Sequence, residues 1–66
     1  MTREFVDLTS NGRVAVLRLN RPDNLNSWNQ PMRDELRDAV AEVVADDALA
    51  VLVITGTGRA FSAGED

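Results

Sequence analysis

The sequence predicts an α/β fold in which a β-hairpin is followed by a helix and a buried parallel strand. Three observations support this order. Two β-prone runs flank an Asn-Gly pair, an apolar stripe of helical period occupies the middle of the chain, and a continuous apolar run follows it. Hydrophobic residues make up 44% of the 66 residues and charged residues 27%, which is typical of a globular chain.

The hairpin is predicted over residues 4–19. Phe5–Thr9 is a short β-prone run, and Arg13–Leu19 is rich in β-branched and apolar residues. The Asn11-Gly12 pair lies between these runs, and it favours a tight turn because both residues tolerate positive φ angles.

A helix is predicted next. Asn29 can cap its N-terminus, and Pro31 fits the first turn, where a missing N–H costs no hydrogen bond. Asp46 and Asp47 end the helical stretch. Such a helix is typically a cover packed on a sheet, and we assign it no chemistry. The apolar stripe has helical spacing and consists of Met32, Leu36, Ala39, Val40, Val43 and Val44.

The last element is predicted from residues 50–55, whose continuous apolar run is typical of a strand buried on both faces of a parallel sheet. Together with the second hairpin strand and the helix it forms a β-α-β crossover. The loops that leave Leu19 and Thr55 then emerge at one carboxyl edge, where such sheets bind ligands. We therefore expect a site formed by Asn20–Trp28 and Gly56–Asp66.

Composition excludes several kinds of site. All seven basic residues are Arg, and the chain contains no Lys, Cys or His. A disulfide scaffold, a Cys/His zinc site and a Ser-His-Asp or Cys-His unit are therefore excluded within this chain. The net charge of −4 argues against a nucleic-acid partner. No apolar run approaches a membrane span or a signal-peptide core, so we expect a cytoplasmic protein with no metal and no membrane partner.

The glycine-rich segment 56–64 does not match the common phosphate-binding motifs. A P-loop requires a Lys, and the dinucleotide fingerprint requires a glycine where Phe61 stands. A simple turn between two elements therefore stays open as its role.

The end of the chain, Ala63-Gly64-Glu65-Asp66, is more suggestive of a site. Two small residues allow the backbone to approach a ligand closely. If a helical turn begins near Glu65, its free N–H groups can stabilise a developing oxyanion. The alternatives are that Glu65 is a solvated acid and that Asp66 is a helix N-cap.

Two motifs lie on the predicted loops. Residues 19–26 read Leu-Asn-Arg-Pro-Asp-Asn-Leu-Asn, and residues 56–66 read Gly-Thr-Gly-Arg-Ala-Phe-Ser-Ala-Gly-Glu-Asp. The first resembles the Leu-Asn-Arg-Pro loop of the crotonase (enoyl-CoA hydratase/isomerase) superfamily, and the second resembles its Gly-x-Gly-x-Ala-Phe-Ser-Ala-Gly-x-Asp loop. Their order and spacing also agree, and the resemblance covers essentially the whole chain. The motifs are specific to the superfamily, but neither fixes the reaction.

The resemblance implies the N-terminal part of a crotonase-like spiral of ββα units and an acyl-CoA thioester as substrate. Two backbone N–H groups would stabilise the thioester enolate, and the first would be the amide of Glu65, not its carboxylate. No separate cofactor is expected, because coenzyme A is part of the substrate. Trp28 would narrow the acyl pocket or pack under its loop. The positions matched to CoA or substrate binding are Asp23, Asn24, Leu25, Ala63, Gly64, Glu65 and Asp66.

The resemblance also implies that the second oxyanion donor and the catalytic acids lie further on. We therefore interpret residues 1–66 as the N-terminal portion of one crotonase-like domain, packed against a chain that carries the remainder, in a homotrimer or a dimer of trimers. An enoyl-CoA hydratase is favoured. An isomerase, another crotonase reaction such as hydrolysis, decarboxylation or synthesis, a non-catalytic crotonase-like binding subunit and a separate interaction module stay open.

Overall fold

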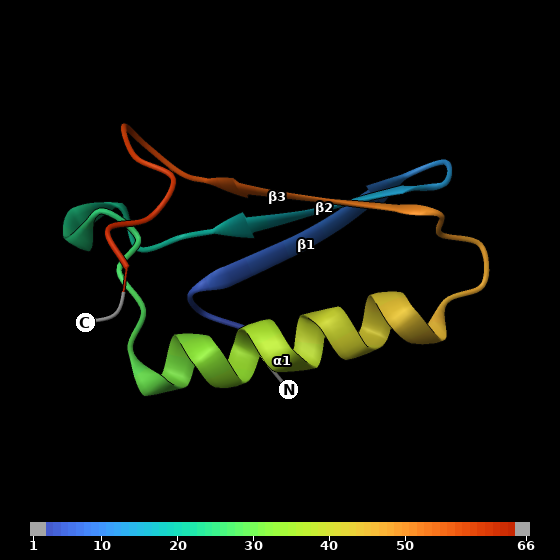
Figure 1. Ribbon diagram of the computed structural model, residues 1–66, viewed down its shortest axis with the longest axis horizontal. Helices are drawn as coiled ribbons and strands as arrows, with labels where there is room; N and C mark the ends of the chain where they lie inside the picture. Colours follow the sequence, from blue (N-terminus) through green and yellow to red (C-terminus); the bar gives the residue numbers. More distant parts are fainter. Residues whose placement is uncertain (1–2, 65–66) are drawn as a thin grey trace.

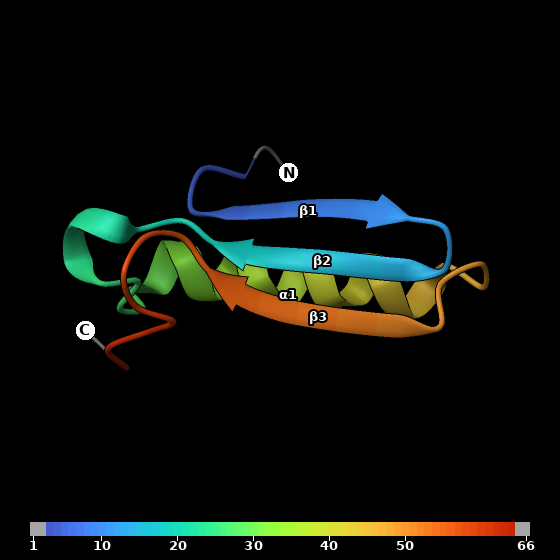
Figure 2. The same ribbon diagram turned by 90° about the horizontal axis from the view of Figure 1, so that it is seen from above.

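The predicted order of elements is confirmed by the computed structural model, which describes residues 3–64. The strands form one sheet in the order β1-β2-β3, with β1 antiparallel to β2 and β2 parallel to β3. The helix α1 lies along one face of this sheet (Figures 1 and 2). The elements are β1 (Val6–Asn11), β2 (Val14–Leu19), the 3-10 helix η1 (Pro22–Asn24), α1 (Gln30–Ala45) and β3 (Val51–Gly56).

The hairpin turn lies one residue later than the Asn-Gly pair suggests. Asn11 pairs with Val14, so Gly12 and Arg13 form the two-residue loop. Gly12 has a φ of +62°, and glycine at the first loop position is typical of a type II′ turn. Asn11 therefore ends β1, and only Gly12 of the pair belongs to the turn.

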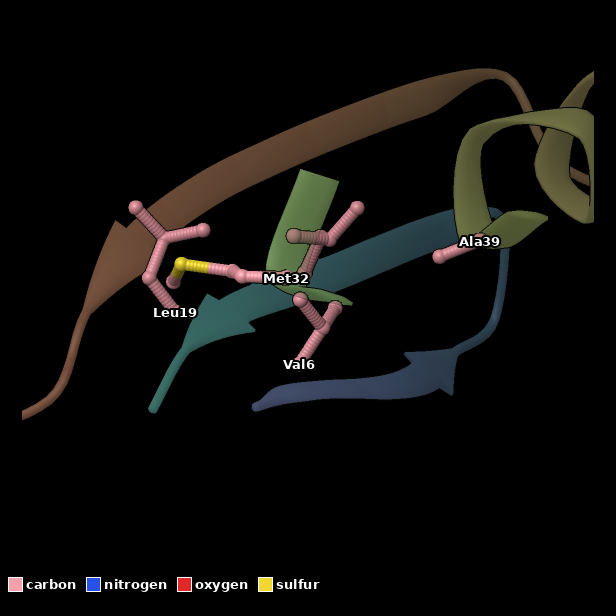
Figure 3. Packing of buried hydrophobic residues seen from close by; sticks show 5 residues of the cluster. Val6, Leu19, Met32 and Ala39 are labelled. Carbon is pink, nitrogen blue, oxygen red and sulfur yellow. The ribbon is translucent and has the colours of Figure 1, made fainter. Parts of the chain in front are cut away.

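The hydrophobic core lies between α1 and the sheet. Alternate residues of β2 point toward α1, because successive side chains of a strand face opposite sides. Figure 3 shows Met32 of α1 lying between Leu19 of β2 and Val6 of β1. Burial of each such large side chain contributes about 1.5–3 kcal/mol. The core cluster is Val6, Leu17, Leu19, Met32 and Ala39, each at most 1% exposed.

The N-cap of α1 is confirmed, but its buried face differs from the predicted stripe. The Asn29 side chain accepts a hydrogen bond from the Met32 N–H at 3.0 Å. Val40 and Val44 are 36% and 77% exposed, whereas Glu35 is only 6% exposed. Glu35 lies three residues after Met32 on the same side of the helix, so it shares that residue's buried face.

Glu35 is buried because it has hydrogen-bond partners there. Its Oε1 accepts from the backbone N–H groups of Glu4, Phe5 and Val6 at 2.7, 2.8 and 3.2 Å. These bonds replace the hydration that a carboxylate loses on burial. Glu35 therefore ties the entry of β1 to α1.

Arg3 adds a second link between the same two segments. It donates to Glu42 and to Asp38 of α1, both at 2.8 Å. The hydrogen bond with Glu42, helped by the one with Asp38, raises the pKa of Arg3 above its usual value. The Asp38 and Glu42 side chains are 38% and 63% exposed, so water competes for these ion pairs more than for the Glu35 bonds, and they contribute less.

β3 is parallel to β2 as predicted, but residues 3–64 do not complete its burial on both faces. Val51 and Val53 are 51% and 43% exposed. The reason is that β3 is an edge strand. Among residues 3–64 the only helix that covers the sheet is α1, and it lies on the face opposite to Val51 and Val53 (Figure 1). An open groove of about 390 Å³ lies between the start of β3 and the C-terminal half of α1, and it is lined in part by Val40, Val44 and Leu52.

Candidate active site

Two loops meet at the carboxyl ends of β2 and β3, as the crossover predicts. We call residues 20–29, which include η1, the first loop and residues 57–64 the second loop. Figures 1 and 2 show them side by side at the same end of the sheet. The Thr57 N–H donates to the Leu19 carbonyl at 2.9 Å, which extends the pairing of the two strands into the loops. This edge is where open α/β sheets bind ligands.

Backbone hydrogen bonds join the two loops directly. The Ala63 N–H donates to the Leu25 carbonyl at 2.9 Å, and the Trp28 N–H donates to the Gly64 carbonyl at 2.9 Å. Three of the predicted site residues, Leu25, Ala63 and Gly64, therefore lie within one short ladder. The two loops therefore form one continuous hydrogen-bonded unit at this edge of the sheet.

Asn26 is the buried centre of this junction. Its side-chain Oδ1 accepts from the Arg21 N–H at 2.7 Å, and its Nδ2 donates to the carbonyls of Thr57 and Ala60 at 2.9 and 2.8 Å. The Ser62 hydroxyl donates to the Asn26 carbonyl at 2.9 Å. Asn26 is 0% exposed and has a φ of +56°, a region that Asn tolerates better than most residues. The carboxamide thus links the first loop to two points of the second.

The Arg21 side chain supports the first loop from within. Its Nη1 donates to the Ser27 carbonyl at 2.6 Å, and the guanidinium lies 5.9 Å from the centre of the Phe5 ring. The latter distance is that of a cation–π contact. The Arg of the Leu-Asn-Arg-Pro motif therefore has a structural role in holding the loop.

Two glycines determine the course of the second loop. A Cβ on Gly56 would lie 2.5 Å from the carbonyl oxygens of Ala60 and Phe61, so only glycine lets the loop fold back at this point. Gly64 has a φ of +95°, which strains residues with a side chain, and its Cβ position faces open space. The space beside the Gly64 Cα is therefore open among the described residues.

Five of the seven predicted binding residues lie within residues 3–64. Asp23 and Asn24 are exposed on η1, Leu25 is partly buried with a φ of +52°, and Ala63 and Gly64 are exposed at the end of the second loop. Leu25, Ala63 and Gly64 lie at the junction, whereas Asp23 and Asn24 lie on the first loop and make no hydrogen bond to the second within residues 3–64. The other two, Glu65 and Asp66, lie outside the described residues.

Trp28 packs against the core cluster beneath the first loop. Its indole N–H is buried and has no hydrogen-bond partner among residues 3–64. Of the two roles considered for this side chain, packing is the one that the structure shows.

The described residues provide no acidic, histidine or cysteine cluster of three or more side chains that could hold a metal ion. The helices within the same range are too short or too polar to cross a membrane. The polar groups that join the two loops are backbone N–H and C=O groups together with the side chains of Asn26 and Ser62.

Comparison with known proteins identifies the family. The family model described as enoyl-CoA hydratase/isomerase matches residues 9–66. The chain belongs to the enoyl-CoA hydratase/isomerase family. The resemblance drawn from the two loop motifs is thereby confirmed, and both motifs lie within the matched range.

Members of this family are similar to the chain in sequence and in fold. The 1,2-epoxyphenylacetyl-CoA isomerase of Escherichia coli K12 is 45% identical over 53 residues, which cover 80% of this chain and 20% of that protein. The crotonyl-CoA hydratase of Syntrophomonas wolfei is 40% identical over 67 residues, with coverages of 100% and 26%. An enoyl-CoA hydratase/isomerase crystal structure from Mycobacterium paratuberculosis matches with a TM-score of 0.93 and 44% identity, over 96% of this chain and 25% of that one. The chain thus spans about a quarter of the length of such family members.

Proposed function

We propose that the protein containing these residues acts on an acyl-CoA thioester and that its reaction is the hydration of an enoyl-CoA. The observation that carries the proposal is the hydrogen-bonded junction of the two loops, which holds the Gly64 backbone at an open position on the carboxyl edge of the sheet. Membership of the enoyl-CoA hydratase/isomerase family supports the choice of substrate.

In this proposal the second loop supplies half of an oxyanion hole. The backbone N–H of Glu65, which follows Gly64 in the chain, donates to the thioester oxygen as negative charge develops on it. Fixed N–H donors stabilise such a charge without any rearrangement during the reaction. Ala63, Gly64 and Asp66 lie along the CoA, and the missing side chain of Gly64 leaves room for it.

The first loop contacts the same CoA from its other side, through Asp23, Asn24 and Leu25. The hydrogen bond from the Ala63 N–H to the Leu25 carbonyl holds the two loops, and therefore their proposed CoA contacts, at a fixed distance from each other. CoA binding to the intact protein should therefore slow hydrogen exchange of the backbone amides in both loops. Protection elsewhere, with both loops unchanged, would contradict this placement.

Residues 1–66 form the N-terminal portion of a single crotonase-like domain in this proposal. The second oxyanion donor and the catalytic acids come from the remainder of that domain, and no cofactor is needed besides the CoA of the substrate. A cytoplasmic homotrimer or dimer of trimers is the assembly that we expect. Light scattering on the intact protein measures the number of subunits.

The test of the reaction uses the intact protein and crotonyl-CoA. Hydration removes the conjugated double bond, so the enoyl absorbance falls and mass spectrometry finds a product heavier by one water. The rival reaction is isomerisation of the enoyl double bond, and the family description, which names both hydratase and isomerase, supports it. It would convert a 3-enoyl-CoA to the conjugated 2-enoyl-CoA, and the absorbance would rise.

Two further results would change the conclusion. Tight binding of CoA thioesters with no turnover of either substrate would indicate a non-catalytic crotonase-like binding subunit. Release of free CoA thiol would indicate a hydrolase. A protein that neither binds nor converts any CoA thioester would overturn the proposed function.

A further inference from the structure

The orientation of the Asn26 carboxamide is fixed by its partners. Nδ2 donates to two carbonyl oxygens, those of Thr57 and Ala60, and Oδ1 accepts from the Arg21 N–H. A carboxamide turned by 180° would place its oxygen against two carbonyl oxygens and its NH₂ group against an N–H. The buried site is therefore matched to an amide and to no other side-chain group of similar size.

The bonds of Asn26 also reach the part of the second loop that leads to the proposed oxyanion donor. Thr57 and Ala60 lie where the loop leaves β3, and the Ser62 hydroxyl donates to the Asn26 backbone carbonyl. Ser62 Oγ in turn accepts from the Gly64 N–H at 3.1 Å. A continuous chain of hydrogen bonds therefore runs from Asn26 to Gly64.

We propose that Asn26 is a positioning residue, which places the second loop so that the amide after Gly64 reaches the thioester oxygen. This inference rests on the proposed function. Asn26 itself touches no reacting atom, because its side chain is fully buried beneath the loops. Its effect on the reaction is geometric, and displacement of a reacting group by about 1 Å can lower a rate on the order of 100-fold.

The test compares two substitutions of Asn26 in the intact protein. Asn26→Leu keeps the size of the side chain but removes all three side-chain hydrogen bonds. We expect kcat to fall on the order of 10- to 100-fold while KM changes by less than about threefold, because an oxyanion donor acts mainly in the transition state. Backbone amides of Thr57, Ala63 and Trp28 should exchange faster than in the parent, while those of the β1–β2 hairpin should not.

Asn26→Asp provides a second readout, the pH dependence of kcat under conditions in which the variant is folded. The introduced carboxyl is buried and faces two carbonyl oxygens, so its pKa is raised above the ordinary Asp value. Burial disfavours the ionised carboxylate, so this group lowers the free energy of unfolding most at high pH. The loss becomes smaller as the pH falls and the carboxyl is protonated. Relative to the parent, kcat and thermal stability of this variant should therefore recover between pH 7 and about pH 4. The charged side chains of the two described loops are Arg21, Asp23 and Arg59.

Asn11→Asp is the matched control, because it makes the same chemical change at an exposed position of the hairpin. It should keep the parent's kcat, KM and pH dependence. If the parent shows no turnover, the proposed function fails, but hydrogen exchange still tests the positioning role. If Asn26→Leu does not fold, the pH dependence of kcat in folded Asn26→Asp decides.

Three results would overturn the proposal. The first is unchanged amide exchange in the second loop of Asn26→Leu. The second is faster exchange in the second loop of Asn26→Leu with kcat unchanged. The third is an Asn26→Asp variant whose difference from the parent does not depend on pH.

Discussion

The Glu35 carboxylate should be the most important polar group for the stability of this segment. One oxygen accepts three backbone N–H groups, those of Glu4, Phe5 and Val6. A hydrogen bond to a charged acceptor contributes about 1.5–3 kcal/mol, and a buried donor without a partner costs about 1–3 kcal/mol. Only the Val6 bond is fully buried, so water can replace part of the other two. We therefore expect Glu35→Ala to lower the free energy of unfolding by about 3 kcal/mol.

Urea denaturation of the intact protein measures this loss, and hydrogen exchange locates it. The amides of the three donor residues should lose protection in Glu35→Ala, while those of β2 should keep it. Glu35→Gln keeps an acceptor oxygen without the charge and should lose about half as much. Glu42→Ala is the control on the same helix, because its side chain is 63% exposed and its ion pair contributes at most about 1 kcal/mol. A loss in Glu35→Ala no greater than that of the control would refute the reasoning.

Three other predictions follow from the exposed strand and from the glycines. Residues 1–66 alone should show no cooperative thermal transition in dilute buffer, because Val51 and Val53 remain half-exposed on an uncovered sheet face. Gly56→Ala should lower the free energy of unfolding by about 1–3 kcal/mol, since its Cβ would meet backbone oxygens at 2.5 Å; an unchanged denaturation midpoint would contradict this. Gly64→Val should reduce kcat at least about 100-fold in a folded protein, whereas Glu65→Ala should retain most activity, because the proposed oxyanion hole uses only the Glu65 amide. A folded but inactive Glu65→Ala would make the Glu65 carboxylate a candidate general base.

The elements of the fold could be predicted because hydrophobic periodicity reports them directly. The hairpin, the helix that begins after Asn29 and the parallel strand were all predicted from apolar spacing and turn residues. The same reasoning assigned Val40 and Val44 to the buried face of the helix and left out Glu35. Apolar spacing alone could not correct this, because the burial of Glu35 depends on N–H groups that lie about thirty residues away in the chain.

The place of the site could also be predicted, because parallel strands end at one edge and both motifs follow them. Asn26 was part of the first motif, yet it received no role of its own. Polar residues in a loop are mostly exposed, and its burial became visible only once Thr57 and Ala60 were placed against it. Asn26 has a positive φ, which Asn tolerates better than most residues, but the φ angle of a residue cannot be read from the sequence.

The two motifs can be divided by what their residues do in the structure. Arg21, Asn26 and Ser62 use their side chains to hold backbone, and Gly56 and Gly64 matter because they have no side chain. None of these roles involves a proton or a nucleophile. The motifs therefore specify a hydrogen-bonded frame, and in the proposed function this frame presents a backbone amide to the thioester oxygen on which charge develops. This explains why the motifs identify the enoyl-CoA hydratase/isomerase family without distinguishing a hydratase from an isomerase.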